Sequence, residues 1–125
     1  MSTFIFNFKQ GFVPSVVSGE KRQTIRAKRK DRRRPVVGDT LKLYSGLRTR
    51  LAKLLRTEVA TEVLAVRIHS DDQLIVVDGR CLTPEEASQF ARADGFADRF
   101  EMLTWFEDTH GKDFEGFCVR WEPTP

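Results

Sequence analysis

One short segment, SGEKRQTIR, combines side chains that could carry out acid–base or nucleophilic chemistry. Its Gly19 permits an unusual backbone turn, and Lys21 lies close in the chain to Arg22 and Arg26. Because like charges disfavour the protonated form of a lysine, a partly neutral Lys21 could act as a base or a nucleophile. Thr24 follows and could be oriented by Lys21. In the alternative interpretation, Lys21 contacts a phosphate and Thr24 is an ordinary strand residue.

The positive charge of the chain is concentrated in its first half. Residues 1–56 carry 15 Lys or Arg and 3 Asp or Glu, whereas residues 57–125 carry 6 basic and 15 acidic side chains. The densest stretch, KRQTIRAKRKDRRR at 21–34, holds nine basic residues and one acid. Such crowded cations repel one another, so folding alone does not favour them, and the stretch predicts a nucleic-acid site. The residues expected to contact phosphates are Arg22, Arg26, Lys28, Arg29, Arg32, Arg33 and Arg34.

Two other interpretations of this charge pattern stay open. The basic stretch could be a solvated loop that only keeps the protein soluble. The opposite charges of the two halves could instead serve protein association, in which the basic half of one copy meets the acidic half of another.

Three further polar residues are candidates for a site. Tyr44 and Arg48 follow an expected strand in YSGLRT, where Tyr44 could stack on a base and Arg48 could reach a phosphate or a base edge. The alternative is a turn with a half-buried tyrosine. Asp94 ends an expected helix before Gly95, where the helix dipole disfavours a carboxylate. Such a placement indicates either a functional residue or a solvated surface residue.

Several classes of protein are excluded by what the sequence lacks. It has no Walker loop, no GxGxxG and no HExxH motif, and its two histidines and two cysteines lack zinc-finger spacing. We therefore expect no cofactor and no metal. At 125 residues the chain is expected to form one domain. It has neither an apolar run near the ~20 residues of a membrane span nor the features of a secretory signal, which predicts a cytoplasmic protein without a membrane partner.

The local patterns predict a mixture of strands and late helices. Alternating apolar residues predict strands over 4–8, 40–44, the second half of 54–69, 73–77 and 114–121, with a hairpin turn at Asp78-Gly79. A short helix or turn is expected over 11–19, with Val16 and Val17 facing inward. Capping signals predict helices over 83–93 and 99–109. This order favours an α+β fold, a small β-barrel or curved sheet of five or six strands with two or three helices.

Four segments together resemble an ASCH domain, a module of the PUA-like β-barrels. They are SGEKRQTIR, PVVGDTLKLYSGLRT, ARADGFADRFEMLTWFEDTHG and FEGFCVRW, and the resemblance extends from Phe4 to Trp121. The variant with LYSGLRT resembles the small stand-alone ASCH proteins that are common in phages and prophages. The resemblance implies one PUA-like domain over 1–125, with a cleft lined by the G-x-K-x-x-T-x-R element and a basic loop at about 27–35.

The resemblance also implies three functions. ASCH domains are proposed to bind RNA, so the chain is expected to recognise RNA or a modified nucleobase in a basic cleft. One bacterial branch is an amidohydrolase that converts N(4)-acetylcytidine to cytidine and acetate with a Lys, a Thr and a Glu. Those residues fall on Lys21, Thr24 and, one methylene shorter, Asp94, which would make these three catalytic. Other ASCH proteins are reported to cleave RNA, which makes a ribonuclease the third possibility.

Overall fold

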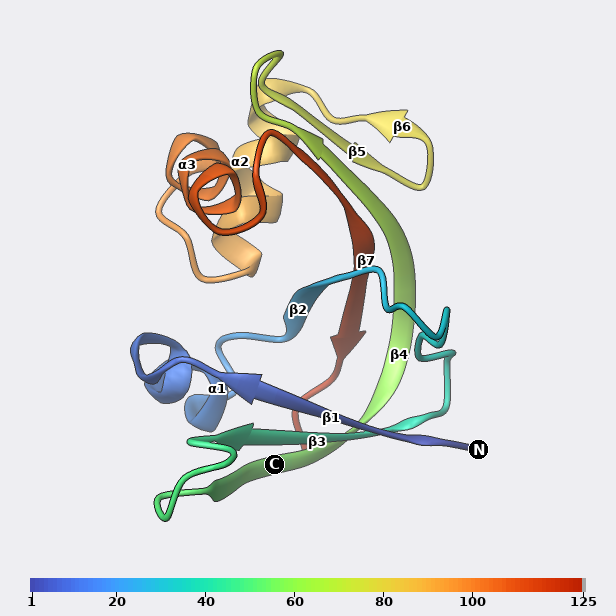
Figure 1. The fold of residues 1–125 in the computed structure, drawn as a ribbon, viewed down its shortest axis with the longest axis vertical. Helices are drawn as coiled ribbons and strands as arrows, with labels where there is room; N and C mark the ends of the chain where they lie inside the picture. Colours follow the sequence, from blue (N-terminus) through green and yellow to red (C-terminus); the bar gives the residue numbers. More distant parts are fainter. Residues whose placement is uncertain (125) are drawn as a thin grey trace. The chain divides into compact units, whose positions relative to one another are not determined.

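The computed structural model describes residues 1–124, which form seven strands, three α-helices and one 3-10 helix (Figure 1). In chain order the elements are β1 (Thr3–Phe8), η1 (Gln10–Phe12), α1 (Val13–Ser18), β2 (Gln23–Ala27), β3 (Thr40–Ser45), β4 (Lys53–His69), β5 (Leu74–Val77), β6 (Arg80–Cys81), α2 (Pro84–Ala93), α3 (Arg99–His110) and β7 (Asp113–Trp121). The strands pair in the order β1-β3-β4-β5-β6, and β7 pairs with both β2 and β4. The expected mixed α+β class is therefore confirmed.

The chain divides into two compact units. Unit 1 comprises Met1–Gln23, Pro35–Val63 and the residues from Val119 onward, and unit 2 comprises Thr24–Arg34 and Leu64–Cys118. Strands β2, β4 and β7 contribute residues to both units. The single ASCH domain expected from the sequence stays a prediction.

Unit 1 is built on the pairing of β1, β3 and the first part of β4. β1 runs parallel to β3, beside which it lies in Figure 1, and β3 runs antiparallel to β4. The alternation of β1 buries Phe4, Phe6 and Phe8 and leaves the residues between them exposed. Because successive side chains of a strand point to opposite faces, this pattern gives unit 1 one apolar face.

Unit 2 holds the second part of β4, the hairpin of β5 and β6, and helices α2 and α3. β5 runs antiparallel to both β4 and β6. The turn between β5 and β6 has Asp78 at φ 49° and Gly79 at φ 80°, which confirms the predicted Asp-Gly hairpin. Figure 1 shows α2 and α3 side by side. Phe106 of α3 lies edge-on to Phe114 of β7, with ring centroids 4.8 Å apart, so an aromatic contact holds α3 to the sheet.

The two late helices begin where the capping signals predict. The Thr83 hydroxyl accepts a hydrogen bond from the Glu86 backbone, and the Glu86 carboxylate accepts one from the Thr83 backbone. The Asp98 carboxylate likewise accepts from the Glu101 backbone at 2.9 Å. These caps satisfy N–H groups that the first helical turn leaves without an intrahelical partner.

Three expectations about the elements were wrong. β2 lies within the basic stretch and was not among the expected strands, and β4 is a strand from Lys53 onward, not only in its second half. Together with the two-residue β6, these differences raise the strand count above five or six. Val16 is fully buried as expected, but Val17 is 48% exposed. Successive side chains of an α-helix point about 100° apart, so α1 buries Val16 and leaves its neighbour Val17 largely exposed.

The cap of α2 predicts a pH-dependent stability. Hydrogen bonds from Arg80 and from the Thr83 backbone lower the pKa of Glu86 from 4.5 to about 2. A carboxylate with a depressed pKa stabilises the fold above its unfolded pKa, and the stabilisation is lost as the pH falls through its folded pKa. Glu86→Gln should therefore lower the free energy of unfolding at neutral pH, and its difference from wild type should shrink between about pH 4.5 and pH 2. Chemical denaturation of both proteins across this pH range measures the difference in their free energies of unfolding.

The neighbouring exposed Glu85 provides the control. Glu85→Gln should show a smaller difference from wild type at every pH. A Glu86→Gln difference that stays constant down to pH 2 would contradict the assigned role of the carboxylate.

Candidate functional site

The basic loop, residues 28–34, forms a turn that is held together by hydrogen bonds to its single acidic residue, Asp31. One oxygen of Asp31 accepts a hydrogen bond from the Arg33 backbone at 2.9 Å, and the other accepts from the Arg29 guanidinium at 3.0 Å. The Arg33 hydrogen bond is the main reason that the pKa of Asp31 lies below its usual value. Arg32 has φ 62° within this turn. The loop therefore presents its cations from a folded turn.

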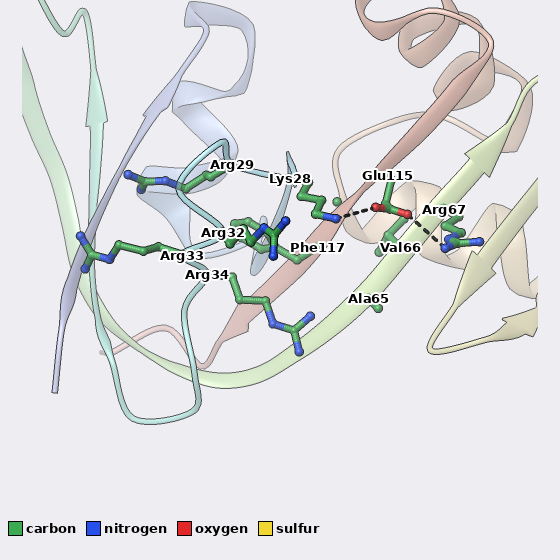
Figure 2. A pocket seen from close by; sticks show the side chains of 11 residues that line it. Lys28, Arg29, Arg32, Arg33, Arg34, Ala65, Val66, Arg67, Glu115 and Phe117 are labelled. Carbon is green, nitrogen blue, oxygen red and sulfur yellow. Dashed lines mark hydrogen bonds and ion pairs between the residues drawn. The ribbon is translucent and has the colours of Figure 1, made fainter.

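The basic loop forms one wall of a pocket of about 450 Å³ in unit 2 (Figure 2). β4 and β7 provide the other walls. The lining contains six cationic side chains and one carboxylate. Its residues are Lys28, Arg29, Arg32, Arg33, Arg34, Ala65, Val66, Arg67, Glu115, Gly116 and Phe117. Hereafter we call this cavity the basic pocket.

The carboxylate of the basic pocket joins two of its cations. Glu115 lies 3.3 Å from the Lys28 ammonium and 3.1 Å from the Arg67 guanidinium, and Figure 2 shows the three side chains in a row. The Lys28 hydrogen bond, followed by the charges of Lys28 and Arg67, lowers the pKa of Glu115. The Lys28 backbone also donates to the Glu115 carbonyl at 3.0 Å. One negative charge is thus fixed among six positive ones.

Strands β2 and β7 approach each other closely at Gly116, a residue that lines the pocket. Gly116 lies against the backbone of Arg26, and a Cβ atom at this position would collide with the Arg26 carbonyl oxygen. Glycine alone fits there, because any side chain would push the two strands apart.

A second cluster in unit 2 contains Thr24, Arg26 and Asp94. The Arg26 guanidinium donates to the Thr24 hydroxyl at 2.9 Å, and burial lowers the pKa of Arg26 to about 10 against the opposing effect of the Asp94 charge. Thr24 and Asp94 are buried, with exposed fractions of 4% and 6%. Asp94 is the C-cap of α2, so the nearby guanidinium offsets the unfavourable helix dipole. Two of the three predicted catalytic residues are therefore buried in polar surroundings.

The third predicted catalytic residue, Lys21, belongs to unit 1. It is buried, with 3% exposed, and its ammonium lies 5.0 Å from the Phe12 ring centroid and 5.9 Å from that of Phe8. Rings at these distances attract a cation through their negative faces. The joint action of Lys21 with Thr24 and Asp94 stays a prediction.

The remaining predicted nucleic-acid contacts lie outside the lining of the basic pocket. Arg22 lies 3.6 Å from Glu122 and donates to the Gly19 carbonyl at 3.2 Å. Tyr44 is half-buried on β3, and Arg48 is exposed at φ 68° in the turn that follows. These three residues belong to unit 1, and their contacts with a ligand stay predictions. The same holds for Arg26, which donates to Thr24.

Sequence reasoning missed Arg67 and Glu115. Arg67 is the one basic residue within VLAVRIH, and Glu115 lies in the aromatic strand FEGFCVRW. The alternation of each strand does predict that these residues face away from the core. Nothing in the local sequence, however, indicates that they meet the basic loop.

Comparisons of the chain with family models, with curated proteins and with solved structures found no match. Within residues 1–124, no helix is long and apolar enough to cross a membrane. The described part of the chain also contains no group of three or more His, Cys, Asp or Glu that could hold a metal ion.

The close contact at Gly116 predicts that adding a side chain at this position strongly destabilises the fold. Gly116→Ala should lower the free energy of unfolding by about 1–3 kcal/mol or more, because the added methyl group meets a backbone atom that cannot rotate away. Gly11→Ala is the matched control, since no atom lies within 4 Å of a Cβ built there. Urea denaturation of both variants measures the difference. Equal stability of the two variants would contradict the close approach of β2 and β7.

Proposed function

We propose that the protein binds nucleic acid through the basic pocket, with RNA as the preferred ligand. The observation that carries the proposal is the gathering of six cationic side chains around one concave site that holds a single carboxylate. A protein that neutralises phosphates releases the counterions condensed on the nucleic acid, which favours binding. The preference for RNA rests on the resemblance to ASCH domains. The relation to PUA-like barrels rests on the same resemblance, since the strand path of the described residues, from β1 to β6, is an open sheet and not a closed barrel.

Two features favour this function over a loop that only confers solubility. The basic loop has defined internal hydrogen bonds through Asp31, and the sixth cation of the pocket, Arg67, comes from a different segment, strand β4. A concave surface lined by one sign of charge concentrates counterions more strongly than a flat one. An exposed loop that served solubility alone would require neither the turn nor the cation on β4.

Salt dependence tests the proposal. The affinity for a single-stranded oligonucleotide should fall linearly with salt on logarithmic axes, because each phosphate contact releases counterions. Replacing Arg32, Arg33 and Arg34 together by Ala should weaken binding and reduce the slope by about 2, since each contact to a single strand contributes roughly 0.7. Fluorescence anisotropy at several salt concentrations measures both quantities.

A second triple variant controls for net charge. Arg92, Arg99 and Lys112 lie outside the basic pocket, so replacing these three by Ala removes the same charge without removing a proposed contact. It should retain most of the affinity and nearly the full slope. Affinity independent of salt, or an equal loss in both triple variants, would overturn the proposal.

The buried cluster supports a second candidate function, an amidohydrolase acting on N(4)-acylated cytidine. Thr24 and Asp94 are polar residues in the interior of a small protein, where their burial costs free energy unless they are partnered. The Arg26 guanidinium that donates to Thr24 would stabilise negative charge as it develops on the hydroxyl oxygen. This hydrogen bond is the observation that makes a threonine nucleophile the second candidate.

The proposed chemistry transfers the acyl group through threonine. Neutral Lys21 would take the hydroxyl proton of Thr24 while the Thr24 oxygen attacks the acyl carbonyl carbon of the substrate. Asp94 would assist proton transfer to the leaving amine, and water would then release acetate from the threonyl ester. In a variant of this mechanism, Lys21 activates water directly and no ester forms.

A hydrolysis assay tests this second function. Wild-type protein should release cytidine from N(4)-acetylcytidine, whereas Lys21→Ala and Thr24→Val should lose nearly all turnover. Thr104→Val, at an exposed position on α3, should retain it. Chromatography separates substrate and product. No release by wild type from nucleoside or RNA substrates would contradict the amidohydrolase and leave nucleic-acid binding unaffected.

A further inference from the structure

We infer that the basic pocket holds one unpaired nucleobase, with the neighbouring phosphates bound by the cations of its rim. The protein would then bind single-stranded nucleic acid in preference to a duplex. This inference rests on the proposed function and adds the form of the nucleic acid that the pocket accepts.

The size of the pocket is the first argument. A cavity of about 450 Å³ falls within the range of sites that enclose a small molecule, roughly 300–1,000 Å³. Phosphates that stay on the outside of a helix need only a flat or grooved cationic surface. The bases of a duplex are stacked and paired, so they reach such a cavity only when a strand is unpaired.

The floor of the pocket is the second argument. Val66 and Phe117 line the pocket together with Ala65 and Gly116 but are almost fully buried, with exposed fractions of 1% and 3%. The apolar surface that a ligand can reach among these four residues therefore belongs to the exposed Ala65 and the half-buried Gly116, neither of which has a polar side-chain atom. Every base has an apolar π-face, so such a floor suits a base better than it suits a phosphate.

Glu115 is the third argument. A site that bound phosphate alone would gain nothing from a carboxylate, because the two negative charges repel each other. Glu115 nevertheless lines the pocket, where it lies 3.3 Å from the Lys28 ammonium and 3.1 Å from the Arg67 guanidinium. A carboxylate can accept hydrogen bonds from the exocyclic amino group of a base, so Glu115 could bind an inserted base in this way.

The rim cations complete the site. In Figure 2, the side chains of Arg29 and Arg33 extend away from Glu115, and the side chain of Arg34 points in a different direction. Cations that spread in several directions from one cavity can contact phosphates on both sides of a base that enters it. Guanidinium groups also stack on base faces.

The test adds apolar side-chain volume inside the basic pocket without changing any charge. Ala65→Leu adds bulk at an exposed position on β4 that lines the pocket. Wild-type protein should bind a single-stranded RNA about tenfold more tightly than a hairpin duplex of equal length, a difference that stacking of one base supplies. Ala65→Leu should lose that advantage, with duplex affinity and salt slope unchanged. Ala93→Leu, at an exposed position on α2 outside the pocket, is the matched control and should bind as wild type.

A second readout does not depend on any variant. A single-stranded RNA that carries one 2-aminopurine should increase in fluorescence when wild-type protein binds, because an inserted base leaves its stacked neighbours. Equal affinity for single strand and duplex, with no effect of Ala65→Leu and no fluorescence change, would overturn the inference and leave salt-dependent binding intact. Absence of salt-dependent binding to every nucleic acid would instead overturn the proposed function.

Discussion

Repulsion among the cations of the basic pocket is the constraint that the surrounding structure must accommodate. Six positive side chains line the cavity, and Glu115 is the one negative group among them. Asp31 organises the turn that carries most of these cations, and Glu115 holds Lys28 beside Arg67. Two carboxylates reduce the repulsion without cancelling it. An external polyanion would balance the remaining positive charge, which is the physical basis of the binding that we propose.

Strand β2 connects this pocket to the buried cluster. Thr24 and Arg26 lie on β2, and the basic loop begins directly after it. The Gly116 contact fixes the Arg26 backbone against β7, and β7 carries Glu115. A ligand that moved the loop would therefore act on the strand that holds Thr24. Binding and any chemistry at Thr24 would share one structural support, although the two functions are tested separately.

The sequence predicts features that depend on near neighbours. The cap of α2 follows from Thr83 and Glu86, because both hydrogen bonds join residues of one turn. The buried face of β1 follows from its alternating phenylalanines, and the crowding of cations in the basic loop was also evident. The pocket itself was not predictable, because Arg67 and Glu115 meet Lys28 only through the pairing of β2, β7 and β4. Strand register depends on packing far along the chain, which local patterns do not encode.

The location of the bound ligand is the most direct test of this account. A heteronuclear NMR titration of labelled protein with a short single-stranded RNA would follow the backbone amides and the arginine Nε–H groups together. If the basic pocket binds the RNA, the largest shift changes should occur in residues 28–34, 65–67 and 115–117. Changes confined to Tyr44 and Arg48, or to the surroundings of Thr24 and Asp94, would contradict the central claim that the basic pocket is the binding site.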